Sequence, residues 1–184
     1  MDLDIDEVAN DKRLNQMVAL SVALLSVAMG LGNTKDGNIV QAMQVAKSDS
    51  VDRWSEYQAS RIKGRIVDAE LTTLSVFPDS PARTAAIASL NEQSAEYRTK
   101  SPVLAKEATA LNDQYDALNV HDDQFDAAET LLAAAIAMAA VSALAASRWL
   151  LAVGWVFGAA GLFMEACGFL ELPFHPDILS KLLG

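Results

Sequence analysis

The sequence predicts an all-α membrane protein with an N-terminal transmembrane anchor, a helical extramembrane domain containing a coiled-coil-like stalk, and a C-terminal transmembrane hairpin. The first reason is the presence of three apolar runs, each close to the roughly 20 residues that a spanning helix needs. The second is a long polar stretch, between the first and second runs, whose apolar residues recur at helical spacing. The third is a heptad pattern that continues from this stretch into the second run.

Composition supports separate polar and apolar regions. The 184 residues are 52% apolar with a mean hydropathy of +0.18, yet they include 14 basic and 24 acidic residues. The net charge of −10 argues against a nucleic-acid partner, because no basic surplus is available to neutralise phosphates. Cys167 is the single cysteine, and His121 and His175 lack zinc or haem spacing. We therefore expect no disulfide within the chain, no metal and no cofactor.

The first apolar run follows an acidic N-terminal tail, residues 1–13, and predicts a transmembrane helix over residues 14–32. Lys12 and Arg13 precede it, as basic residues precede the core of a signal peptide. The apolar core is long for a signal peptide and offers only a poor cleavage site, which favours an uncleaved anchor. We expect "GLGN", the sequence from Gly30 to Asn33, to end this helix.

The other two runs predict a transmembrane hairpin of helices over residues 127–147 and 149–170, with a turn at Ser147 and Arg148. A C-terminal tail, residues 171–184, follows and could form a short interfacial helix after Pro176.

Two features of the last span bear on its surroundings. Trp149 and Trp155 lie near the turn, as aromatic residues do at a bilayer interface. Gly154 and Gly158 fit the small-xxx-small spacing that allows two helices to approach closely. The spacing leaves open whether this contact forms within the hairpin or between chains.

Residues 33–126 form the predicted extramembrane domain. Its first part has an apolar stripe at mainly three- and four-residue steps: Ile39, Met43, Ala46, Trp54, Ile62, Ile66 and Ala69. In "FPDSP", Ser80 can cap a new helix with Pro81 at its first position. Ser101 and Pro102 repeat this signature, so we expect a further helix to begin there.

The heptad pattern starts after this second signature. Its positions alternate steps of four and three: Leu104, Ala108, Leu111, Tyr115, Leu118, Asp122, Phe125, Glu129, Leu132, Ile136, Ala139, Ala143 and Ala146. No proline or glycine occurs between Val103 and Arg148, which predicts one helix running from solvent into the membrane. The alternative is two helices that share a phase, with a break at residues 119–123.

An apolar seam of this length predicts assembly, because an exposed apolar stripe needs a partner. The expected assembly contacts, in a homo-oligomer or with a membrane-complex partner, are Leu111, Tyr115, Leu118, Phe125, Gly154 and Gly158.

Two carboxylates lie in or beside the predicted hairpin. Glu129 is 19 residues before Arg148 and Glu165 is 17 residues after it, which places both near the same membrane boundary. In one interpretation both side chains are solvated at this edge. In the other they face each other or a symmetry axis and, with Asp122, share a proton or bind a cation.

The distribution of basic residues favours a cytoplasmic N-terminus and hairpin turn, with the extramembrane domain in the periplasm. This predicted orientation rests on Lys12, Arg13 and Arg148, because three spans would bring these residues to one side of the membrane.

Several segments together resemble family 4337 of the bacterial domains of unknown function. They are "NDKRLNQMVALSVALLSV", "DGNIVQAMQVAKSDSVDRWSEYQASRIKGRI", "HDDQFDAAETLLAAAIAMAAVSAL" and "RWLLAVGWVFGAAGLF". The resemblance covers nearly the whole chain, and its most specific part is Asp52–Lys63 with the Phe125–Asp126 pair before the hairpin. It implies a bacterial inner-membrane protein with one N-terminal anchor and a C-terminal pair of spans. The family has no established activity and so implies no catalytic residue.

The sequence thus predicts a non-enzymatic, multi-pass membrane scaffold or accessory subunit that assembles through its stalk and small-residue transmembrane faces. The alternative is a small oligomeric channel or ion-coupled component with Glu129, Glu165 and Asp122 at the membrane edge. No arrangement of a nucleophile, base and orienting acid supports an enzyme.

Overall fold

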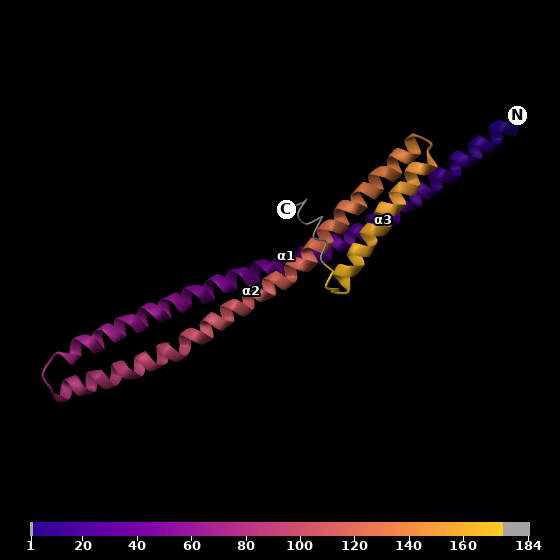
Figure 1. Cartoon of the computed structure of the whole chain (residues 1–184). Coiled ribbons are helices and arrows are strands. Elements are labelled where there is room, and N and C mark those ends of the chain that lie inside the picture. The colour runs from indigo at the N-terminus through magenta and orange to yellow at the C-terminus, as the bar shows by residue number, and fades with distance from the viewer. Residues whose placement is uncertain (1, 175–184) are drawn as a thin grey trace. The chain divides into compact units, whose positions relative to one another are not determined.

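A computed structural model describes residues 2–174 of the chain, with side chains from Lys12 onward, and shows three helices and no strand in that part. They are α1 (Asp2–Ser75), α2 (Pro81–Leu144) and α3 (Arg148–Phe169) (Figure 1). The predicted all-helical class is confirmed. Each helix contains a segment long and apolar enough to cross a membrane. His175 and the expected interfacial helix lie outside the described residues.

The chain divides into two compact units. Met1–Ala42 and Ala117–Gly184 form one, which we call the three-helix unit, and Met43–Asp116 form the other, the two-helix unit. The three-helix unit contains the start of α1, the end of α2 and all of α3. The two-helix unit is an antiparallel pair made of the remainder of α1 and α2.

The two-helix unit is joined along a seam of mostly small side chains. Ser60 Oγ lies 3.0 Å from Ser101 Oγ, and both residues are buried. Ser50 Oγ lies within hydrogen-bonding distance of Ala108 O at 3.2 Å and of Asn112 Oδ1 at 2.9 Å. Short side chains let the two backbones approach closely, and each buried hydroxyl has a polar partner across or along the seam.

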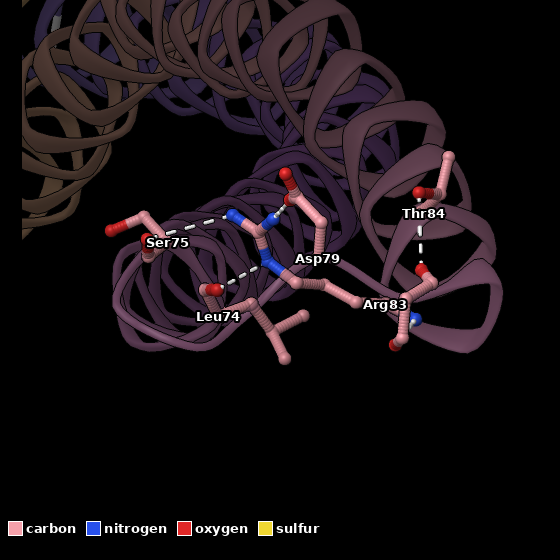
Figure 2. A network of polar contacts seen from close by, with 6 residues as sticks. Leu74, Ser75, Asp79, Arg83 and Thr84 are labelled. Carbon is pink, nitrogen blue, oxygen red and sulfur yellow. Dashed lines mark hydrogen bonds and ion pairs between the residues drawn. The ribbon is translucent and has the colours of Figure 1, made fainter.

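The turn of the two-helix unit confirms the cap predicted at "FPDSP". Ser80 Oγ accepts a hydrogen bond from the Arg83 backbone N–H at 3.2 Å, and Pro81 is the first residue of α2. The carbonyls of the last turn of α1 need partners, and α1 has no basic residue there. Arg83 of α2 provides the missing donors: its Nε donates to Leu74 O at 2.7 Å and its Nη2 donates to Ser75 O. The same guanidinium also pairs with Asp79 (Figure 2).

Two expected helix boundaries are wrong. α1 continues through Gly30–Asn33 instead of ending there, and none of the glycines in the described residues has positive φ. Gly32 is a site of close approach, since a Cβ there would lie 2.8 Å from Glu165 Oε1. Pro102 lies inside α2, where a proline removes one backbone hydrogen bond of the helix.

The single helix predicted from Val103 onward is confirmed, because α2 has no break at residues 119–123. It ends at Leu144, a little before the predicted boundary. Ala146 has a left-handed φ of 46° in the turn, and Ser142 Oγ donates to Ser147 O at 3.0 Å.

The apolar stripe predicted on the first part of the extramembrane domain is partly wrong. Ile39, Met43 and Ala46 are buried, but Ile62 and Ile66 are 59% and 53% exposed. The buried seam instead continues through mostly small or polar side chains with two larger apolar ones, Val67 and Leu104. The small or polar members are Ser50 and Ser60 on α1, and Ser94, Ser101 and Ala108 on α2.

The three-helix unit is packed in successive layers along its helices. Near the α2–α3 turn, Leu14 and Val18 of α1 contact Ala139 of α2 and Leu151 of α3. Further along, Leu25 packs with Leu132 and Ala135: this cluster also includes the partly buried Met29 and Ile136. Trp155 Nε1 of α3 donates to Ser21 Oγ of α1 at 2.9 Å.

The glycines of α3 face the other helices of the same chain. A Cβ on Gly154 would lie 3.1 Å from Ala135 O, and one on Gly158 would lie 3.2 Å from Leu25 Cδ2. The small-xxx-small contact left open by the sequence is therefore made within the chain, with α2 and α1.

Candidate functional site: an acidic cluster in the three-helix unit

The main polar cluster of the three-helix unit is made by α1 and α2. Asp36 on α1 and Asp122 on α2 lie close enough for each carboxyl group to affect the ionisation of the other, and Asp36 Oδ1 is buried without a hydrogen-bond partner among the described residues. Two carboxyl groups at close range repel each other when both are ionised, which favours protonation of one of them. The pair is therefore a place where a carboxyl group between the two helices retains its proton more readily than an isolated aspartate does.

The surroundings of the pair favour its protonated form. Burial, followed by the charges of Asp122 and Asp126, raises the pKa of Asp36 from 3.8 to about 7, with a smaller contribution from Glu129. Burial also raises the pKa of Asp122, despite the opposing effect of its hydrogen bond with Asp36. The pKa of Asp126 is raised by burial and then by Asp122, Asp123 and Glu129. The cluster thus changes charge near neutral pH.

The two glutamates meet consecutive residues of α1. Asn33 Nδ2 donates to Glu129 Oε1 at 3.4 Å, and Glu165 lies against Gly32. This arrangement agrees with the predicted similar depth of the two carboxylates.

The two glutamates differ in exposure. Glu129 is exposed, whereas Glu165 is only 5% exposed and its Oε1 has no hydrogen-bond partner among the described residues. The interpretation in which both side chains are solvated is therefore wrong for Glu165, which is buried within its own chain.

The sequence interpretation missed Asp36, although a signal for it was present. Gly32, Asp36, Ile39 and Met43 follow steps of four, three and four, the spacing used for the seam of α2. The expected helix end at Asn33 hid this register, because it separated Gly32 from the stripe that begins at Ile39.

Gln124 was also missed. It is fully buried, and its Nε2 donates to Leu172 O at 2.8 Å and to Phe174 O, which attaches the segment after α3 to α2. His121 Nδ1 lies 3.0 Å from Gln124 Oε1. Among the described residues no group of acids, histidines and cysteine is arranged to hold a metal ion.

The predicted assembly contacts of the stalk face their own chain. Tyr115 is half-buried with Lys47 Nζ 5.4 Å from its ring centroid, and Phe125 is buried with its ring 5.3 Å from that of Phe169. Leu111 and Leu118 are half-buried. The premise that one chain cannot cover the seam is therefore wrong for much of its length, because α1 and α3 of the same chain contact it.

Comparison with known proteins gives one match. The model of a family described as Domain of unknown function (DUF4337) matches residues 14–171. No curated protein and no solved structure matches the chain. The matched range includes every residue of the acidic cluster and the whole of the two-helix unit.

Proposed function

We propose a function on the premise that the chain belongs to the DUF4337 family. In this proposal the chain is a non-enzymatic, three-pass inner-membrane protein that serves as a scaffold or accessory subunit. Its polar helical domain, residues 33–126, lies in the periplasm.

The observation that carries this proposal is the apolar outer surface of the three-helix unit. On α1, Leu20, Leu24, Val27 and Leu31 are between 60% and 64% exposed. Further exposed apolar residues lie on α2 and α3: Val141, Leu144, Trp149, Val156, Leu162 and Phe163. An apolar surface on three helices is unfavourable in water but is the surface that lipid requires.

The burial of the seam within one chain changes the kind of partner that we expect. Since α1 already covers much of the seam of α2, assembly of a second copy through Leu111, Tyr115 and Leu118 is not needed for folding. We therefore propose that the two-helix unit presents its outer, polar surface to a different membrane-complex partner. A protein of monomeric mass in mild detergent agrees with this proposal, whereas a homo-oligomer whose cross-links join seam residues of two copies contradicts it.

The topology can be tested with single cysteines in a Cys167→Ala background. A cysteine at Asp79 should react with a membrane-impermeant maleimide in intact cells whose outer membrane is permeable to the reagent. A cysteine at Ser147 should react only after the inner membrane is opened. The same result at both positions would contradict three spans, while exchanged results would keep the spans and reverse the orientation.

The Asp36–Asp122 pair favours an ion-coupled component as a second candidate function. A buried carboxyl group that titrates near neutral pH between two helices is a feature of proteins that couple proton binding to conformation or transport. In proteoliposomes with an imposed pH gradient, we expect a proton leak that Asp36→Asn reduces several-fold, while Asp49→Asn, an exposed control, leaves it unchanged. A leak no larger than that of empty liposomes would remove this candidate.

A further inference from the structure

A groove of about 650 Å³ lies on the two-helix unit beside the serine contact of the seam. At this level the side chains between the helices are short, and a Cβ on Gly64 would lie only 3.5 Å from Tyr97 Cβ. The close approach of the two backbones leaves the longer side chains on either flank to form the walls of the groove. Its volume is in the range of sites for small molecules, about 300–1,000 Å³.

Three arginines line this groove. Arg61 and Arg65 come from one face of α1, and Arg98 comes from α2. Asp68 is the one acidic residue in the lining, and its Oδ1 lies 3.3 Å from Arg98 Nη2. Arg65 has no hydrogen bond or ion pair within the described part of the chain, so the groove holds more positive than negative charge.

The positive charge extends beyond the lining. Residues 57–67 and 97–106 contain six of the 14 basic residues of the chain and none of its 24 acidic residues. The Ser60–Ser101 contact brings these two stretches together. In a chain of net charge −10, this belt is a local reversal of the electrostatic potential, which attracts anions.

The side chains of the groove are also partly oriented. Arg61 Nη1 donates to the Tyr57 hydroxyl at 3.0 Å, and its guanidinium carbon lies 5.7 Å from the centre of the same ring. Arg53, in contrast, lies outside the groove and is paired with Glu56 at 3.2 Å and Glu107 at 3.3 Å. Its charge is neutralised locally, whereas that of the groove is only partly neutralised by Asp68.

We propose that this groove binds a soluble small molecule bearing phosphate groups. A planar guanidinium presents two N–H donors that match two phosphate oxygens, and arginines on both walls can hold more than one phosphate. The tyrosine rings provide an apolar wall for the rest of the ligand. The site lies within the two-helix unit, and its assignment does not depend on the proposed membrane function.

The test uses the full chain in nanodiscs of neutral phosphatidylcholine and measures binding of inorganic pyrophosphate by calorimetry. We expect a dissociation constant below about 1 mM at low salt and weaker binding at 0.5 M salt, because salt screens exposed charges. Arg61→Gln with Arg65→Gln should weaken binding at least about ten-fold, the effect of losing charge-assisted hydrogen bonds. Arg53→Gln is the matched control and should leave binding unchanged.

Asp68→Asn gives a second and opposite readout. It removes the one acid of the lining and releases Arg98, so binding should tighten about three-fold or more. A gain of affinity cannot result from misfolding, and it keeps the proposal testable if the double arginine variant fails to fold. Absence of pyrophosphate binding, equal loss with Arg53→Gln, weaker binding with Asp68→Asn, or equal binding of citrate would each overturn the phosphate site.

Discussion

Replacing Gly161 by leucine should lower the stability of the three-helix unit by about 3 kcal/mol or more, the upper range for overpacking a well-packed interior. A Cβ at this position would lie 2.8 Å from Leu132 Cγ and 3.1 Å from the backbone nitrogen of the same residue. A flexible side chain can move away, but a backbone atom inside α2 can move only if the two helices separate. The measurement is unfolding by dodecyl sulfate in mixed micelles, followed by far-UV circular dichroism.

Gly30 provides the matched control, since it lies in the apolar segment of α1 and has open space where its Cβ would be. Gly30→Leu should be neutral or slightly stabilising, because leucine favours the helix over glycine by up to about 1 kcal/mol. Adding Leu132→Ala to Gly161→Leu should restore part of the lost stability, as expected for two residues in direct contact. Equal effects at Gly30 and Gly161 would show that the α2–α3 contact is not as close as described.

The sequence was informative where a boundary is set by local chemistry. The turn after α1 is coded by the two prolines and Ser80 of "FPDSP", and the cap was predicted from those residues alone. The long uninterrupted part of α2 was likewise predictable, because no glycine or proline interrupts residues 103–148 and the heptad phase is regular.

The sequence was misleading where packing overrides local preference. Glycine and proline each disfavour a helix interior. Gly30–Asn33 was therefore interpreted as the end of one helix, and Ser101–Pro102 as the start of another. In the structure they are positions of close packing: Gly32 is beside Glu165, and Ser101 is bonded to Ser60. A stripe of apolar residues could not reveal a seam built from serine, alanine and glycine.

Asp36 was missed for the same reason, because packing continues α1 beyond the point where local preference predicted its end. Asp122 and Glu129 were noticed as charged members of an apolar pattern, but Asp36 lies on a helix that was expected to have ended. Spacing along α2 places both Asp122 and Glu129 on the seam, although Glu129 is exposed, and only the partner helix determines which acid has a second carboxyl group beside it. The acid that α1 places beside Asp122 is Asp36, whose pKa is raised to about 7 by burial and by its acidic neighbours.

The stability of the protein should fall as the pH rises from about 5 to 8, and Asp36→Asn should remove much of this fall. Asp36 has a pKa of about 7 in the folded chain against 3.8 for an unperturbed side chain. The folded state therefore binds more protons than the unfolded state between these values, so stability is present at low pH and is lost as pH rises through 7. Asp122 and Asp126, whose pKa values are also raised, act in the same direction.

Asparagine at position 36 keeps the shape of aspartate and can donate an N–H to Asp122 without titrating. The full shift would correspond to about 4 kcal/mol, and partial exposure of the group to solvent reduces this, so we expect Asp36→Asn to stabilise the protein by roughly 1–3 kcal/mol at pH 8. At pH 5 the variant and the natural chain should differ by less than about half as much, because the stability lost through Asp36 accumulates between pH 3.8 and pH 7. Thermal unfolding in detergent at both pH values measures the difference, with Asp49→Asn as the exposed control. A natural chain that is equally stable at pH 5 and 8 would show that the pKa of Asp36 is not raised in the folded state, and the ion-coupled function would then lose its structural basis.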